Sequence, residues 1–170
     1  MNKFKSSYSI RRVETELINA SFECSIKELE QTARTAEDAA NSLNVNQGSI
    51  VKTLVFWTDD CKEKKPVISL IAGDRICNTE ELKKEINHNG ALTKMEAGDV
   101  KKVTGFTIGG VSPVGLINPI PIVVDDSIFR FERVWCAAGH PFFVFSISPR
   151  DLVSITSGKV SNKVGISNNF

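Results

Sequence analysis

The sequence has few of the side chains on which enzymes usually build their chemistry. Its 170 residues include only two histidines, and its four cysteines lie far apart, without a CxxC pair or a histidine at metal-ligand spacing. No GxSxG elbow, HExxH motif or P-loop is present. We therefore expect neither a metal nor another cofactor, and any catalysis would depend on positioning and backbone hydrogen bonds.

The chain also lacks an excess of either charge. Its 21 lysines and arginines almost balance 20 aspartates and glutamates, which gives a net charge of +1. A protein that neutralises many phosphates of a nucleic acid is strongly basic. A nucleic-acid ligand would therefore be contacted locally, at one end or by one loop.

Long apolar runs are missing as well. None is long enough to span a bilayer, and residues 1–6 lack the apolar core of a signal peptide. A chain of this length buries roughly 68–70% of its unfolded surface, so it does not need disulfides for stability. We expect a cytoplasmic protein with reduced thiols and no membrane partner, folded as one domain over residues 1–170.

The apolar pattern predicts a mixed α+β fold. Helical spacing and capping residues predict helices over the following segments: 9–19, 35–43, 78–86, 98–104 and onward from 148. Alternating or β-branched runs predict strands over these segments: 22–26, 50–57, 66–72, 120–125, 134–137 and 142–146. The prolines of the 120–125 segment indicate an edge strand or a strand start. We expect a hairpin loop over the charged residues 58–65 and a frayed tail from residue 159, in which Val160 and Val164 pair only briefly.

Residues 104–115 are the most informative segment. They hold four glycines and a proline in a run that is otherwise apolar and hydroxylated. Glycine lets backbone N–H groups approach a ligand closely, and proline stiffens the chain. Such a loop can present main-chain donors to a ligand, although by itself it is more simply a tight connection. Lys52, after the turn-rich residues 46–49, and the turn at residues 137–141 favour the functional interpretation.

Several motifs, in one colinear order over about residues 10–160, resemble the YbaK-type editing deacylases. These are free-standing relatives of the insertion domain of bacterial prolyl-tRNA synthetases. The matching motifs are the helix at 35–40, Gln-Gly-Ser-Ile-Val-Lys-Thr-Leu-Val-Phe at 47–56, Ala-Gly-Asp-Arg at 72–75, the glycine loop at 104–115, Val-Val-Asp-Asp at 123–126, Val-Trp at 134–135, Ala-Gly-His at 138–140 and Ser-Pro-Arg-Asp-Leu at 148–152. The resemblance implies the YbaK fold, a mixed and mostly antiparallel central sheet, barrel-like and surrounded by helices.

The resemblance also implies a function in translation fidelity. The family hydrolyses the ester of mischarged aminoacyl-tRNA, chiefly tRNA(Pro) carrying a small wrong amino acid, in trans. The implied partners are the acceptor end of aminoacyl-tRNA and a prolyl-tRNA synthetase. Residues 135–140 resemble the cysteine-releasing subgroup less than the broader family. The alternative is a binding module on the same scaffold that recognises an aminoacyl-adenosine or nucleotide end without hydrolysis.

By resemblance, Lys52 is the functional lysine, suited to a phosphate or the ribose of the 3′ end. Residues 109–113 match the family's Gly-x-x-x-Pro loop, which places the substrate carbonyl and an attacking water with help from a ribose hydroxyl. The predicted catalytic residues are Lys52, Gly109, Gly110 and Ser112. The predicted substrate-binding residues are Val111, Pro113, Asp125, Gly139 and His140.

Alternatives remain for individual positions. Lys52 alone could be a solvated lysine on a strand edge. Ser112 fits a turn as well as a water-orienting hydroxyl. Asp125 either orients Lys52, holds the loop or simply ends a strand. His140 either lines the aminoacyl pocket, contacts the tRNA end or belongs to a plain turn.

Overall fold

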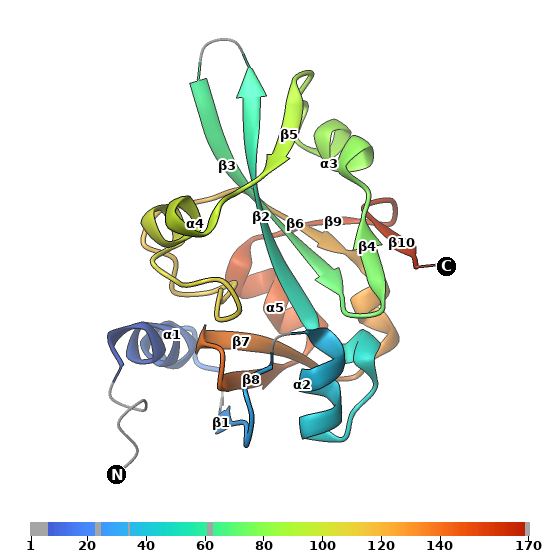
Figure 1. Cartoon of the computed structure of the whole chain (residues 1–170). Coiled ribbons are helices and arrows are strands. Elements are labelled where there is room, and N and C mark those ends of the chain that lie inside the picture. Colours follow the sequence, from blue (N-terminus) through green and yellow to red (C-terminus); the bar gives the residue numbers. More distant parts are fainter. Residues whose placement is uncertain (1–6, 23–24, 34, 61–62, 169–170) are drawn as a thin grey trace.

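A long hairpin organises the structure. The computed structural model describes residues 7–22, 25–33, 35–60 and 63–168. Strands β2 (Val51–Asp60) and β3 (Glu63–Ala72) pair antiparallel along their full lengths and run through the centre of the molecule (Figure 1). The predicted hairpin loop at residues 58–65 was therefore wrong, apart from residues 61 and 62, which lie outside the described residues. Thr58 bonds with the Lys65 backbone, and Asp59 lies opposite Lys64, so polar cross-strand pairs extend the ladder.

The hairpin belongs to a five-stranded sheet of order β5-β2-β3-β6-β9. Its further strands are β5 (Ala91–Lys94), β6 (Ile122–Asp125) and β9 (Lys159–Ser161). The sheet is mixed, because β6 runs parallel to both β3 and β9. Strands β5 and β9 are its two edges, so it is not the barrel-like closed sheet that we expected.

Two predictions about this sheet are resolved by the pairing. The 120–125 segment is a strand start rather than an edge: Pro121 precedes β6 and its carbonyl accepts a hydrogen bond from the Ile68 N–H at 2.9 Å. The expected fraying from residue 159 was wrong. Strand β9 pairs with β6, and β10 (Gly165–Ser167) pairs with β4 (Arg75–Cys77), since each finds a partner distant in sequence.

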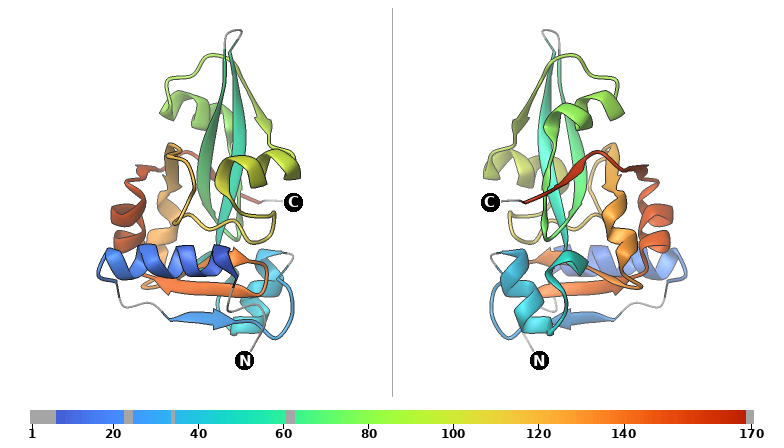
Figure 2. Two further views of the ribbon diagram at one scale, coloured as in Figure 1. Left: turned by 90° about the vertical axis from the view of Figure 1, so that its left-hand side faces the viewer. Right: turned by 90° about the vertical axis from the view of Figure 1, so that its right-hand side faces the viewer.

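A three-stranded antiparallel sheet lies across the lower end of the hairpin (Figures 1 and 2). It contains β1 (Ile26–Glu28), β8 (Phe143–Ile147) and β7 (Val134–His140), in that order. The expected strand at 22–26 begins only at Ile26, and residues 23 and 24 lie outside the described residues. A register shift between Ala137 and His140 marks a β-bulge in β7.

All five predicted helices form. They are α1 (Tyr8–Asn19), α2 (Ala36–Leu43), α3 (Thr79–Glu85), α4 (Ala97–Thr104) and α5 (Pro149–Thr156). Local side chains define their ends: Thr35, Asn78 and Ser148 accept N-cap hydrogen bonds. Two 3-10 turns, η1 (Gln47–Ser49) and η2 (Asp126–Arg130), flank the hairpin. In the described part of the chain, no helix combines the length and apolarity needed to cross a membrane.

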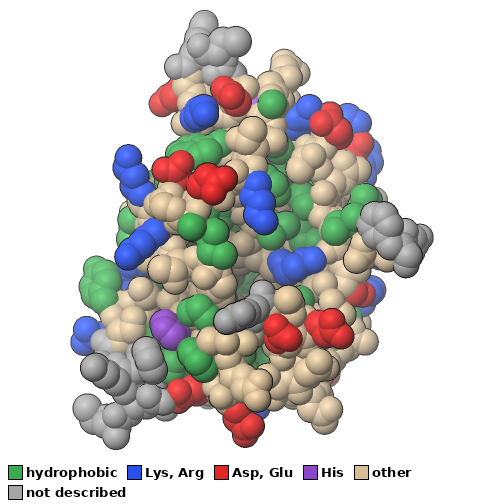
Figure 3. All heavy atoms as spheres, viewed as in Figure 1, with side chains coloured by type: hydrophobic (Ala, Val, Ile, Leu, Met, Phe, Trp, Pro, Cys, Tyr) green, Lys and Arg blue, Asp and Glu red, His purple; other side chains and the backbone are tan. Residues whose placement is uncertain are grey.

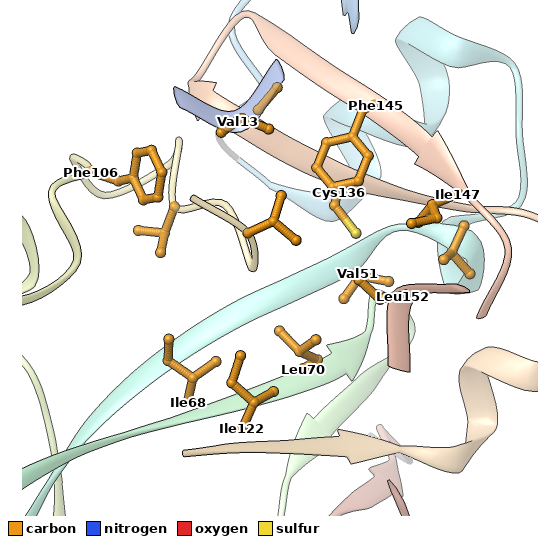
Figure 4. Close-up of a cluster of buried hydrophobic side chains, with 14 of the residues drawn as sticks. Val13, Val51, Ile68, Leu70, Phe106, Ile122, Cys136, Phe145, Ile147 and Leu152 are labelled. Carbon is orange, nitrogen blue, oxygen red and sulfur yellow. The ribbon is translucent and has the colours of Figure 1, made fainter. Parts of the chain in front are cut away.

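The main core lies between the two sheets. Val51, Ile68 and Leu70 of the hairpin meet Cys136 and Phe145 of the smaller sheet (Figure 4). Helix α1 adds Val13 and Leu17, both fully buried. This packing holds the smaller sheet against the lower half of β2, and β5 reaches only the upper half.

Candidate active site

A cavity of about 440 Å³ opens beside the lower half of β2. The glycine loop and α4 lie on one side of it, and α2 and the smaller sheet lie on the other. It is lined by Ala33, Thr35, Ala36, Ala39, Ile50, Val51, Lys52, Thr53, Leu54, Val55, Phe56, Lys94, Met95, Val100, Ile108, Gly109, Val111, Trp135, Ala137, Pro141, Phe143 and Val144. On the face seen in Figure 3, hydrophobic side chains near the centre are flanked by two basic ones. The cavity is thus largely apolar, with cations at its margin.

Part of the cavity wall is strand edge. Strand β5 pairs with β2 only over residues 56–59, and below them the Met95 N–H donates to the Val55 carbonyl at 3.1 Å. Alternate residues of a strand direct their backbone groups to the same side. The N–H and C=O of Thr53 therefore point to the same edge as the Val55 carbonyl, where β5 no longer provides a partner.

Lys52 lies at the margin of this cavity, on the sheet face opposite to Thr53. Strand alternation places it with Leu54 and Phe56, whereas Val51 and Val55 enter the main core. Its Nζ donates a hydrogen bond to the Arg75 carbonyl. Burial lowers the pKa of the Lys52 ammonium, and the nearby acidic groups, chiefly the Asp74 carboxylate, oppose that effect. Lys52 is therefore a half-buried cation, which its hydrogen bond holds in place, and not a freely solvated lysine.

The turn that holds Lys52 is itself clamped. Arg130 of η2 makes two hydrogen bonds to the Asp74 carboxylate, at 2.7 and 2.9 Å. The hydrogen bond from Arg130 lowers the pKa of Asp74 and keeps it ionised. The Gln47 side chain donates to the Gly73 carbonyl at 3.1 Å. These contacts fix the turn between β3 and β4, and with it the carbonyl that receives Lys52.

The glycine loop needs its two adjacent glycines for different reasons. Gly109 has φ of +87°, a conformation that favours glycine. Gly110 lies so close to His140 that an added Cβ would be 2.7 Å from the His140 backbone N and Cα. The Gly110 N–H donates to the Thr107 carbonyl at 3.0 Å. Among the described residues, the N–H groups of Gly109 and Val111 have no acceptor, and both residues line the cavity.

The structure therefore gathers some of the predicted site residues and separates others. Lys52, Gly109 and Val111 line the cavity, and Gly110 supports it from behind. Ser112 is completely buried, and its Oγ accepts from the Val114 N–H at 3.2 Å, a turn geometry. Pro113 lines a second cavity, of about 350 Å³, on the side of α1 and α5.

Asp125 and Gly139 also lie behind the cavity wall. Asp125 is fully buried and accepts hydrogen bonds from the Ala72 N–H, the Ser127 N–H and the Ser127 hydroxyl. It thus ties η2 to the end of β3, close enough to act on the Lys52 charge. Gly139 has φ of +86° in the β7 bulge, and an added Cβ would be 2.9 Å from the Ser9 carbonyl.

His140 is half-buried next to the cavity residue Pro141. Its Nδ1 accepts a hydrogen bond from the Phe142 N–H at 3.3 Å, and its ring stacks on Phe142 and meets the edge of Phe143. Burial lowers the pKa of His140 below its usual value. The imidazole is therefore a neutral acceptor that shapes the turn at the cavity margin.

We expect His140 to make the stability of the fold pH-dependent. Because its folded pKa lies below the unfolded value of about 6.5, its contribution is complete above that pH and is lost as the pH falls through the folded pKa. Protonation of Nδ1 would also remove the acceptor for the Phe142 N–H. The free energy of unfolding in urea, measured from pH 7.5 to 5, should fall more steeply for wild type than for His140→Gln. Parallel curves would contradict this assignment.

Among the cavity residues that the sequence predictions did not include are Thr53 and Lys94. The Thr53 Oγ1 is buried and has no hydrogen-bond partner among the described residues. A buried hydroxyl without a partner is unfavourable by about 1–3 kcal/mol and is often completed by a ligand. The only sequence signal was the position of Thr53 directly after Lys52, which in a strand implies the opposite face. In the described residues, no group of three or more His, Cys, Asp or Glu side chains could hold a metal ion.

Comparison with known proteins connects this cavity to a family. The family model described as "Aminoacyl-tRNA editing domain" matches residues 30–155, a range that contains every cavity residue. The chain is 26% identical over 152 residues to the uncharacterised protein YwhH of Bacillus subtilis, covering 89% of this chain and 94% of YwhH. It is 26% identical over 125 residues to EbsC of Enterococcus faecalis, named as a candidate Cys-tRNA(Pro)/Cys-tRNA(Cys) deacylase, covering 74% of each.

Longer proteins and solved structures agree with these relatives. A proline–tRNA ligase of Desulforamulus reducens is 42% identical over 94 residues, which are 54% of this chain and 15% of the ligase. A crystal structure described as a candidate trans-editing enzyme for prolyl tRNA synthetase superposes with a TM-score of 0.84 at 30% identity, covering 95% of this chain and 99% of the other.

Proposed function

This chain belongs to the family of aminoacyl-tRNA editing domains, and from that premise we propose that it is a trans-editing deacylase of tRNA(Pro) carrying a small, non-cognate amino acid. Water attacks the carbonyl carbon of the ester, the bond to the ribose oxygen breaks, and free tRNA and the amino acid are released. The observation that carries the proposal is the cavity that brings Lys52, Thr53 and the unpaired N–H groups of Gly109 and Val111 together.

Lys52 is assigned to the phosphate or ribose of the terminal adenosine. Its ammonium is a compact charge on a long stem, which suits a phosphate. Its hydrogen bond to the Arg75 carbonyl holds the charge at the cavity margin before substrate arrives. A cation already partly desolvated loses less hydration on binding, so its attraction to a phosphate is stronger than that of a surface lysine.

The N–H groups of Gly109 and Val111 are assigned to the substrate carbonyl. Backbone donors aimed at a developing oxyanion stabilise the transition state without reorganisation, and removing one such donor costs about 2.7–4 kcal/mol in other hydrolases. Because the Gly110 N–H already bonds to the Thr107 carbonyl, it holds the turn and leaves the N–H groups of its two neighbours for the ligand. The unpaired backbone edge at Thr53 lies on the other side of the same cavity.

The base that activates water is assigned to the substrate. Among the described residues that line the cavity there is no aspartate, glutamate or histidine. His140 lies beside the cavity, but its Nδ1 is occupied by the Phe142 N–H. The free hydroxyl of the terminal ribose lies next to the ester in every aminoacyl-tRNA, and it is the group assigned to orient the attacking water.

Release of free amino acid from a panel of tRNA(Pro) species tests the proposal. We would compare alanyl-, cysteinyl-, seryl- and prolyl-tRNA(Pro) under single-turnover conditions. We expect fast release of at least one small amino acid and slow release of proline. The contrast can be modest, since an apolar pocket separates substrates that differ by one methylene by only about 1–3 kcal/mol. No release from any species, with binding retained, would favour the binding-module alternative.

Thr53 provides a prediction in which activity and stability change in opposite directions. Thr53→Val keeps the shape and removes a buried hydroxyl that has no partner among the described residues. We expect the free energy of unfolding to stay unchanged or rise by about 1 kcal/mol, because an unsatisfied polar group is removed. Deacylation should fall by about tenfold if the hydroxyl bonds the substrate. Chemical denaturation and single-turnover hydrolysis measure the two effects, and a variant as active as wild type would remove Thr53 from the site.

A further inference from the structure

Lys94 is a second cation on the cavity wall, and it has no partner in the described residues. It is exposed and is the last residue of the edge strand β5. Four lysines of the described residues form ion pairs with carboxylates: Lys65 with Glu63, Lys83 with Glu80, Lys84 with Glu81 and Lys159 with Glu85. Lys94 has neither an ion pair nor a hydrogen bond of this kind, although it lines the cavity. Its charge is therefore available to an anion.

The register of the sheet places Lys94 on the same face as Lys52. Lys94 lies directly opposite Phe56, and cross-strand partners share a face. Lys52 precedes Phe56 by four residues, so it also shares that face, at a distance of about 13 Å along β2. Leu54 lies between them and lines the same cavity. The two lysines thus lie on one face of the sheet, at the two ends of a segment of β2 that lines the cavity.

That arrangement fits a single strand of RNA better than a compact anion. Proteins that bind single strands use cations that follow the backbone, with apolar surface for the bases. Two lysines this far apart suit two different phosphates. Because the chain has almost no net charge, such a local track is also the kind of contact that its composition permits.

We propose that Lys94 binds a phosphate of the unpaired 3′ end, on the 5′ side of the terminal adenosine, while Lys52 holds the terminal nucleotide. The inference rests on the proposed deacylase function and deepens it. The single-stranded end then runs from the cavity along β2 toward β5, so the enzyme reads more than the aminoacyl-adenosine. Lys94 is a binding residue in this arrangement and takes no part in the chemical step.

Substrates of different length test the assignment. One is the aminoacyl-adenosine with a free 5′-hydroxyl, and the other is the aminoacyl-CCA trinucleotide with a 5′-phosphate. Both carry the amino acid that wild type releases fastest from tRNA(Pro). We expect Lys94→Ala to raise KM about three- to tenfold for aminoacyl-CCA and for aminoacyl-tRNA. We expect no change in kcat, and no change in either constant for aminoacyl-adenosine.

The salt dependence of KM is a second measurement, and it would not change if Lys94 had only a structural role. The slope of log KM against log salt concentration should be smaller by about 0.7 in Lys94→Ala than in wild type. This difference is the value expected for one phosphate contact with a single strand. Lys94→Arg should restore both slope and KM, because the charge is kept. Lys101→Ala is the matched control, since Lys101 is an exposed cation of α4 that does not line the cavity.

Two results would overturn the assignment. An equal loss on aminoacyl-adenosine would place Lys94 in the aminoacyl pocket or in the fold, and an unchanged KM on aminoacyl-CCA would mean that it touches no phosphate. If wild type hydrolyses nothing, the proposed function fails. The Lys94 contact is then tested by the affinity of a labelled CCA trinucleotide, which Lys94→Ala should weaken with the same change in salt slope and which must stay unchanged if the inference is wrong.

Discussion

Replacing Lys52 by alanine is expected to reduce deacylation about 100-fold while the protein remains folded. Truncating one partner of a desolvated charge pair costs about 2–5 kcal/mol, and the phosphate of the terminal nucleotide would lose such a partner. The fold should tolerate the change, because burial lowers the pKa of Lys52. The charged ammonium is therefore less favourable in the folded protein than in the unfolded chain. One hydrogen bond, to the Arg75 carbonyl, is lost. The free energy of unfolding should change by no more than about 1 kcal/mol.

Single-turnover hydrolysis and denaturant unfolding, measured on the same preparations, separate the two effects. Lys52→Arg keeps the charge but replaces a compact ammonium by a planar guanidinium, so we expect deacylation activity between that of Lys52→Ala and that of wild type. Lys64→Ala, in the exposed part of β3, is the matched control and should be as active as wild type. An active Lys52→Ala variant, within threefold of wild type, would exclude Lys52 from substrate binding.

The second large effect is expected for Gly110→Ala. The added Cβ would lie 2.7 Å from both N and Cα of His140 and 2.8 Å from its carbonyl carbon. These are backbone atoms in β7, so no side chain can rotate to make room. The turn closed by the Gly110 N–H and the Thr107 carbonyl must move, and the N–H groups of Gly109 and Val111 move with it. We expect at least a 100-fold loss of activity, and about 1–3 kcal/mol of stability.

Gly98 offers a control for the same chemical change. It lies in α4, and an added Cβ would have nothing within 4 Å. Gly98→Ala should therefore stabilise the protein by about 0.5–1 kcal/mol through helix propensity, with activity unchanged. Thermal unfolding and single-turnover hydrolysis of both variants provide the comparison. If Gly110→Ala were as active as wild type, the loop would not position the substrate.

Much of the fold was predictable because its signals are local. Thr35, Asn78 and Ser148 cap helices through hydrogen bonds to residues two or three positions further on, and Gly105 ends α4 in a left-handed conformation. Such interactions depend only on neighbouring residues. The predicted family was also confirmed, because its motifs recur in one order along the chain and match the editing-domain family.

Strand pairing was less predictable. The charged segment 58–65 has the composition of a loop, yet its described residues, 58–60 and 63–65, extend the hairpin because they continue the β2–β3 ladder. The polar segment at residues 159–161 joins the sheet only because β6 provides a parallel edge. In both cases the partner strand outweighs local propensity, and a partner's position is a property of the folded chain.

The same distinction applies to the site. From the sequence alone came the family, the lysine and the glycine loop. Only the tertiary structure decided which neighbours of these residues face the cavity: Gly109 and Val111 do, whereas Ser112 is buried in a turn. It also added Thr53 and Lys94, because the side chain of a strand residue takes its surroundings from strands and loops far away in sequence. Motif residues can be recognised one by one, but a cavity exists only where distant segments leave space between them.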